Sequence, residues 1–124
     1  MKAMRKTPVL ALVMTVALAS PACAEDPPCK SKVAQACFTV RGSLLAANGT
    51  PSFRIMVTET QRVLGIDGGE NPPLPDAVRR ELAPDMFSNR LSGDYSVCPQ
   101  AEEHPGSMQM VCVRSASNLT LAPR

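Results

Sequence analysis

The feature that most constrains the fold of this 124-residue chain is the dipeptide Asn48-Gly49, which stands between two stretches of alternating apolar and polar residues. Asn-Gly is the preferred pair for a two-residue type I′ hairpin turn, because both residues tolerate positive φ. A turn there pairs residues whose numbers add up to 97, such as Leu44 with Phe53. One face of the hairpin is then apolar and the other mostly polar, as in a half-buried antiparallel pair. The sequence therefore predicts a hairpin over residues 38–58.

The polar face of this hairpin carries two arginines. In the predicted register Arg41 pairs with Met56, and Arg54 lies one pair further toward the turn on the same face. Arginine binds carboxylate and phosphate groups through paired hydrogen bonds. Arg41, Arg54 and Met56 are therefore the candidate face for an envelope protein or a small anionic ligand. The alternative is a solvated surface on which Glu59 pairs with an arginine.

The rest of the chain predicts three more strands and one helix. Short runs rich in apolar residues are typical of strands, and they lie at 61–66, 91–98 and 108–113. Pro75 or Asp76 starts a helix that Pro84 ends. The order strand, strand, strand, helix, strand, strand is that of the OB-fold, a five-stranded Greek-key barrel. We expect a mainly β, OB-fold-like barrel with one short helix; another small α+β fold with an antiparallel sheet is the alternative.

The first 24 residues have the layout of a secretory signal peptide. Basic residues precede an apolar run at 9–18, and Ala22-Cys23-Ala24 supplies the small residues of a cleavage site. The run is about half of the ~20 residues that span a bilayer, so we expect no transmembrane segment after processing. Lipidation of Cys23 is the weaker alternative, because Pro21 fits the lipoprotein pattern poorly. We expect cleavage after Ala24 and a periplasmic or secreted product.

Removal of residues 1–24 leaves 100 residues, which is the size of a single domain. Ten basic and eleven acidic residues remain, so the formal net charge becomes −1. A near-neutral domain has no electrostatic footprint for nucleic acid or an anionic membrane, and neither is an expected partner. We expect residues 25–36 to form a flexible N-terminal arm and residues 37–124 to form one small β-rich domain.

Four cysteines remain after processing, and an even count in a small secreted domain predicts two disulfides. They are Cys29, Cys37, Cys98 and Cys112, and three connectivities are open. A closing hairpin centred near Pro105 puts Cys98 opposite Cys112, within disulfide reach. We favour Cys98–Cys112 with Cys29–Cys37 over the crossed pairings. None of the spacings is C-x-x-C, so neither a zinc ribbon nor a thioredoxin-type redox pair is indicated.

The sequence offers little for catalysis. His104 is the single histidine; it stands beside Glu103 at a Pro-Gly turn, which is typical of a solvated residue rather than of a metal ligand or an acid–base group. There is no G-x-S-x-G motif and no second histidine for a triad. We therefore expect no catalytic residues, no metal site and no cofactor.

Four segments also carry a family resemblance. FTVRG (38–42), NGTPSFRI (48–55), GDYSVCP (93–99) and MQMVC (108–112) together span about residues 37–119. They resemble a family of small, uncharacterised secreted proteins of proteobacteria. The resemblance implies an extracytoplasmic location and no particular activity.

Three functions from different classes remain. A non-catalytic binding module of unknown ligand or partner demands the fewest special residues, so it is the expected function. The alternative is a secreted inhibitor or effector that acts through a disulfide-held loop at 100–107. A small hydrolase ranks last, because the chain lacks an evident nucleophile, base or metal site.

Overall fold

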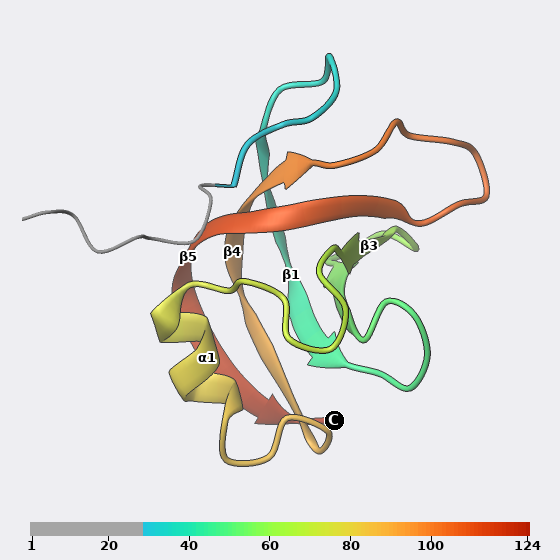
Figure 1. Ribbon diagram of the computed structural model, residues 1–124. Coiled ribbons are helices and arrows are strands. Elements are labelled where there is room, and N and C mark those ends of the chain that lie inside the picture. The colour runs from blue at the N-terminus through green and yellow to red at the C-terminus, as the bar shows by residue number, and fades with distance from the viewer. Residues whose placement is uncertain (1–28) are drawn as a thin grey trace, which may run out of the picture.

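Five strands form one sheet that closes on itself, and one short helix lies between the third and fourth strands along the chain (Figure 1). The structure is a computed structural model that describes residues 29–124. Its elements are β1 (Phe38–Ala46), β2 (Phe53–Val57), β3 (Val63–Ile66), α1 (Asp76–Leu82), β4 (Asn89–Pro99) and β5 (Gln109–Pro123). The predicted signal peptide and residues 25–28 of the predicted arm lie outside the described residues.

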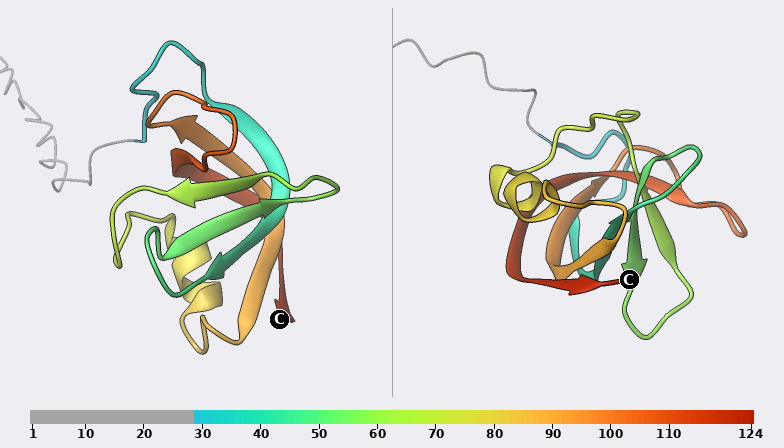
Figure 2. Two further views of the ribbon diagram at one scale, coloured as in Figure 1. Left: turned by 90° about the vertical axis from the view of Figure 1, so that its right-hand side faces the viewer. Right: turned by 90° about the horizontal axis from the view of Figure 1, so that it is seen from below.

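The strand order around the ring is β1-β2-β3-β5-β4, and β4 pairs with β1 to close it. β3 and β5 run parallel, whereas all other neighbours are antiparallel. The prediction of a mainly β fold with one short helix is confirmed, and the order of elements fits the OB-fold-like description. Figure 2 shows the ring from two further sides, with α1 against the long, curved strand β5.

The hairpin of β1 and β2 is present, but its register differs by two residues from the predicted one. Leu44 lies opposite Ile55, so the partner numbers add up to 99. In the predicted register Pro51 would stand opposite Ala46 inside the ladder, where a proline has no N–H to donate. Pro51 is instead buried in the loop, and the last backbone bond of the hairpin joins the N–H of Ala47 to the carbonyl of Ser52 at 2.7 Å.

The shift leaves the faces of the hairpin unchanged. A strand alternates its side chains with a period of two, so an even shift keeps the same residues pointing inward. Leu44 and Ile55 are fully buried, whereas Met56 on the other face is exposed. The division into an apolar and a polar face is therefore as predicted.

The interior of the ring is apolar and receives side chains from every strand and from α1. Tyr95 is the largest fully buried side chain, and its hydroxyl donates a 2.5 Å hydrogen bond to the backbone carbonyl of Leu91. The core consists of Leu44, Ala46, Phe53, Ile55, Leu64, Ile66, Val78, Leu82, Leu91, Tyr95, Val97, Val111 and Val113.

The helix lies where the sequence predicts it. Pro75 precedes α1, and Asp76 stands in its first turn, where a carboxylate favours the helix dipole. Val78 and Leu82, four residues apart, face the core, which is the spacing of one helical face. The helix therefore packs an apolar side against β4 and β5.

β5 extends ten residues beyond its predicted end at Val113 and reaches Pro123. Its first part pairs with β3 and with the end of β4, and its second part pairs back along β4 as far as Asn89. The stretch 114–118 consists of polar and small residues, so hydrophobic alternation does not reveal a strand there. The long pairing with β4, interrupted by two register shifts, supplies this part of the ring.

The disulfides join Cys29 to Cys112 and Cys37 to Cys98. The favoured pairing of Cys98 with Cys112 and of Cys29 with Cys37 is therefore wrong, although Cys98 and Cys112 are register partners as predicted. The reason is the closure of the ring: β1 pairs with β4 from its first residue, which places Cys37 beside Cys98.

Hydrogen bonds also hold the segment before β1 against the closing hairpin. The backbone N–H of Lys32 donates to the carbonyl of Pro99 at 2.9 Å. The Gln100 side-chain amide donates to the carbonyl of Lys30 at 2.7 Å. Residues 29–37 are thus fixed to β4 and β5 by two covalent bridges and by backbone contacts. Within residues 29–124, no helix is long and apolar enough to cross a bilayer.

Candidate functional site

Arg41 of the predicted binding face lies on the β1–β4 side of the ring. Its Nη1 is 3.3 Å from Oδ1 of Asp94, its register partner on β4. The Asn118 side-chain amide donates a 2.7 Å hydrogen bond to the other carboxylate oxygen. The Arg41 side chain is 66% exposed, so water and salt weaken this ion pair. Arg41 already has an acidic partner on the protein surface.

Arg54 lies well away from Arg41. Its partner on β1 is Leu45, four residues after Arg41. At about 3.3 Å per residue, this separates the two arginines by about 13 Å along the strand. The predicted register places Arg54 only two residues from the level of Arg41, and the two-residue difference in register doubles this separation. Arg54 and Met56 remain together on the outer side of β2.

The parallel pairing of β3 with β5 brings further residues beside these two. Leu64 and Ile66 are fully buried, so the residues that alternate with them on β3 face outward. Gly65 has Arg54 as its partner on one side and Met110 on the other. We call this outer surface the methionine face; it consists of Arg54, Met56, Val63, Gly65, Met108 and Met110.

Gly65 has no side chain, and neighbouring side chains fill the space that one would occupy. A Cβ at this position would stand 2.7 Å from Sδ of Met110, 2.8 Å from Sδ of Met108 and 2.6 Å from Cγ of Pro51. Real Cβ atoms do not approach other atoms so closely, so a side chain here would have to displace the Pro51 ring and both thioethers. The two thioethers therefore lie across the bare backbone of β3. Met56, on the neighbouring strand, is 43% exposed.

An open cleft of about 640 Å³ adjoins this face between the start of β3 and the β4–β5 loop. Arg62 is one of its lining residues and has three partners. Its Nη2 donates a 2.6 Å hydrogen bond to Oε1 of Gln109 and lies 3.3 Å from the carboxylate of Glu103. Its guanidinium carbon is 5.3 Å from the centre of the Phe38 ring, a cation–π distance.

Gln109 connects this cleft to the rest of the fold. It is only 4% exposed, and its amide donates to Oε1 of Gln35 at 2.8 Å and to the carbonyl of Ala101 at 3.2 Å. Its amide oxygen accepts the bond from Arg62. Gln109 therefore holds the N-terminal segment, the β4–β5 loop and Arg62 in fixed positions relative to one another.

His104 lies in the exposed β4–β5 loop and lines the same cleft as Met108. The backbone N–H of Ser107 donates to its carbonyl at 3.1 Å, which closes the loop tip. His104 is therefore an exposed residue of the loop that borders the methionine face.

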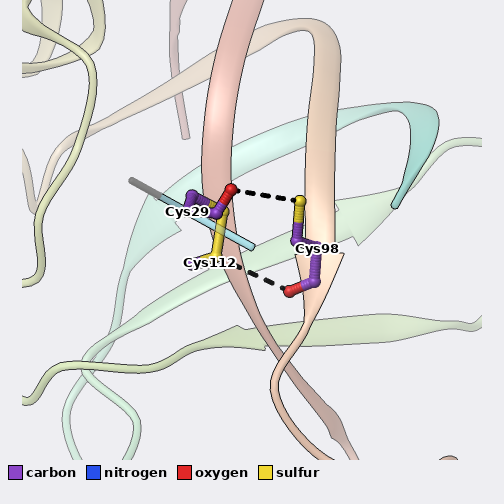
Figure 3. A group of neighbouring side chains, drawn as sticks. All are labelled: Cys29, Cys98 and Cys112. Atoms are coloured by element: carbon purple, nitrogen blue, oxygen red, sulfur yellow. Dashed lines mark hydrogen bonds between the residues drawn. A yellow bond between two sulfur atoms is a disulfide. The ribbon is translucent and has the colours of Figure 1, made fainter. Parts of the chain in front are cut away.

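Figure 3 shows a cluster of three cysteines whose sulfur atoms lie within 4.8 Å of one another: Cys29, Cys98 and Cys112. Sγ of Cys98 is 3.6 Å from the carbonyl oxygen of Cys29. Metal binding by cysteine requires a thiolate, and all three sulfurs belong to disulfides. The cluster therefore joins parts of the fold and offers no metal ligand in this oxidised state.

A second open cleft, of about 660 Å³, lies beside the Cys29–Cys112 disulfide. Its charged lining residues are Lys30, Lys32, Asp67 and Arg114. All four side chains are exposed, so salt screens their attraction for an anion. This cleft has a general cationic character without a fixed set of hydrogen-bond donors aimed at one point.

The sequence interpretation included Met56 and Arg54 but missed Met108, Met110 and Gly65. The alternation Met108-Gln109-Met110 in a predicted strand already places both methionines on one face. What the sequence does not show is the parallel neighbour across which they lie, because β3 and β5 are more than forty residues apart.

Comparison with protein-family models, with curated proteins and with solved structures found no match to this chain. Its function is therefore inferred from its own residues and geometry.

Proposed function

We propose that this protein is a non-catalytic binding module of the periplasm or the extracellular space, and that it binds through the methionine face. The main support is the arrangement of side chains on the outer side of the sheet. Arg54 and the exposed thioether Met56 lie there on β2, and Met108 and Met110 lie on the other side of β3. Exposed apolar groups rimmed by polar residues are typical of interaction sites.

The position of this face in the fold supports the proposal. OB-folds bind their ligands on the face of strands 2 and 3 and through the loops between strands 1 and 2 and strands 4 and 5. The methionine face lies on β2, β3 and the start of β5, and the β4–β5 loop borders it through the cleft at Arg62. A strand surface is also a more rigid platform than a loop.

The two disulfides support the proposed compartment. Disulfides persist in the periplasm and outside the cell and are rare in the cytosol. Both bridges here join distant parts of the chain, with sequence separations of 83 and 61 residues between the paired cysteines. This framework fits a secreted or periplasmic product, and cleavage after Ala24 remains part of the proposal.

A cross-linking experiment tests the module and its face. The tagged protein is recovered from its own cell envelope after mild cross-linking, as wild type and as Arg54→Ala/Met56→Ala. A matched control, Arg90→Ala/Leu121→Ala, removes an exposed arginine and an exposed large apolar residue from β4 and β5. We expect one specific partner with wild type and control, and its loss with the face variant.

The face assignment fails if both double variants retain the partner equally. If no protein is recovered, direct titration with small anions follows, and the same two variants apply. A wild-type protein that binds neither a partner nor an anion would contradict the proposal, whereas a melting temperature lowered only in the face variant would show a structural role for Arg54 and Met56.

A second candidate function is inhibition of another protein through the β4–β5 loop. Residues 101–107 are all exposed, and the strands that carry the loop are each anchored by a disulfide, at Cys98 and at Cys112. Such a loop is held ready to enter a partner's cleft, as inhibitor loops are. Replacement of 102–106 by glycine and serine would abolish this activity while the fold and the methionine face persist.

A further inference from the structure

We propose that Met108 and Met110 form a binding site for a soft monovalent metal ion, Cu(I). This inference rests on the binding-module function proposed above and names a ligand for the methionine face. The sequence predicts no metal site on the grounds of its single histidine and its cysteine spacing, and those grounds do not concern thioether sulfur.

The geometry places the two sulfurs around one point, above the buried backbone of Gly65. Sδ of Met110 and Sδ of Met108 lie 2.7 and 2.8 Å from the same position, that of the missing Cβ of Gly65. The distance between the two sulfurs is therefore at most about 5.5 Å. A metal ion held by two sulfurs at about 2.3 Å from each needs a sulfur–sulfur distance of up to about 4.6 Å, which small side-chain rotations provide.

Gly65 makes room for this arrangement. Glycine inside a strand weakens the strand, and it commonly marks a place where a ligand or another chain segment approaches the backbone closely. Here the space above Gly65 is occupied by two thioethers and by Pro51. Both methionines are partly exposed and lie on the outer side of β3, opposite the core.

The donor type selects the metal. Thioether ligands are soft and uncharged, and they favour Cu(I), whereas carboxylate and carbonyl oxygens suit Mg²⁺, Ca²⁺ and Mn²⁺. A monovalent ion also tolerates Arg54 nearby better than a divalent ion would, since its repulsion by the guanidinium is half as large at equal distance. Arg54 is in addition directed toward the Pro51 carbonyl, to which its Nε donates at 3.2 Å.

Two further residues offer donor atoms on the same side of the molecule. His104, the single imidazole of the chain, lines the cleft that Met108 also lines. Imidazole nitrogen is a good copper ligand. Met56 is an exposed thioether on β2. Its partner on β3 is Val63, and Met108 precedes β5 on the other side of Val63. The methionine pair is the essential part of the proposal, and His104 is the third ligand we assign.

The test is a Cu(I) titration under anaerobic conditions with bicinchoninate as the competing chelator, repeated with Ag(I) as a redox-inert probe. The mature chain, which begins at Glu25, is used, because its four cysteines are all in disulfides and no free thiolate competes for the ion. Methionine methyl groups are followed by carbon-13 NMR. We expect one ion per chain and shifts confined to the methyl groups of the methionine face.

Leucine replaces methionine with little change of volume, so Met108→Leu/Met110→Leu removes the thioethers while it preserves packing. Changes outside the ligand set of a metal site already cost 10- to 100-fold in affinity, so loss of both ligands should weaken binding by at least about a hundredfold. Met86→Leu, next to the core and outside the face, is the matched control and should bind as wild type does. His104→Ala should weaken binding less than the double variant.

The proposal is overturned if wild type fails to compete with the chelator, if the double variant binds as well as wild type, or if the methyl resonances of Met108 and Met110 stay unchanged. Circular dichroism of each variant separates loss of a ligand from loss of fold. Failure here with the cross-linked partner still lost in Arg54→Ala/Met56→Ala would leave the binding-module function standing. If wild type binds no Cu(I) and the cross-linking experiment also finds no partner that depends on Arg54 and Met56, both proposals are wrong.

Discussion

Cys98 and Cys112 face each other on β4 and β5, yet each is covalently bonded to the segment that precedes β1. Their sulfur atoms, with that of Cys29, lie within 4.8 Å. Strand register alone therefore does not decide the pairing. The N-terminal segment passes both cysteines, and its own two cysteines bond to them in nested order.

The nested disulfides should be recovered by peptide mapping without reduction. We expect one cross-linked peptide pair that contains Cys29 and Cys112 and another that contains Cys37 and Cys98. Because both bridges close long loops, Cys29→Ser/Cys112→Ser should lower the free energy of unfolding by about 2–5 kcal/mol in urea titration. A peptide that joins Cys98 to Cys112 would contradict the structure.

The sequence determines the elements of this fold better than their pairing. Asn48-Gly49 located the hairpin, and the alternation on both sides fixed which residues face inward. The register depended on one local fact, the exclusion of Pro51 from the ladder, which shifted Leu44 from its predicted partner to Ile55. Local turn preference alone does not carry that information.

The candidate site shows the same limit at longer range. Arg54 and Met56 were predictable as neighbours, because they stand two residues apart on one strand. Met108 and Met110 were predictable as a pair for the same reason. Their place beside Gly65 follows only from the parallel pairing of β3 with β5, which a single sequence does not encode locally.

Tyr95 should contribute to stability through its buried hydroxyl. The hydroxyl donates a 2.5 Å hydrogen bond to the carbonyl of Leu91, and the residue is fully buried. Tyr95→Phe removes the donor and leaves the ring in place. We expect a loss of about 1–3 kcal/mol in the free energy of unfolding, measured by urea titration at neutral pH. An unchanged midpoint would mean that water replaces the hydroxyl at no cost.

The same residue should make the protein less stable in alkali. Burial raises the pKa of Tyr95 well above its ordinary value of about 10. The folded state keeps the proton where the unfolded chain releases it, so this contribution is complete below about pH 10 and is lost as the pH rises toward the folded-state pKa.

The expected slope from Tyr95 alone is up to about 1.4 kcal/mol per pH unit above about pH 10, and Tyr95→Phe should lack it. Tyr95 is the single tyrosine of the chain, so the ultraviolet absorbance of tyrosinate reports on it directly. The folded protein should show no tyrosinate at pH values where the urea-unfolded protein is ionised. Ionisation at the same pH in both states would refute the burial argument.

Two arginines that each contact a carboxylate should differ in their importance for stability. Arg41→Met removes an ion pair in which Arg41 is 66% exposed, and such pairs contribute at most about 1 kcal/mol. Arg62→Met removes the donor to Oε1 of Gln109, which is buried and also holds Gln35. A buried acceptor without a partner costs about 1–3 kcal/mol.

We therefore expect Arg62→Met to lower the free energy of unfolding more than Arg41→Met in paired urea titrations. Gln109→Leu also removes the donors to Gln35 and to Ala101, so Arg62→Met/Gln109→Leu should lose less than the sum of Arg62→Met and Gln109→Leu, because the bond between the two side chains is lost in each single change. Equal effects of Arg62→Met and Arg41→Met would show that Gln109 finds water in place of Arg62. In that case the cleft beside the methionine face would be hydrated down to Gln109, and Arg62 would act there mainly as a surface cation.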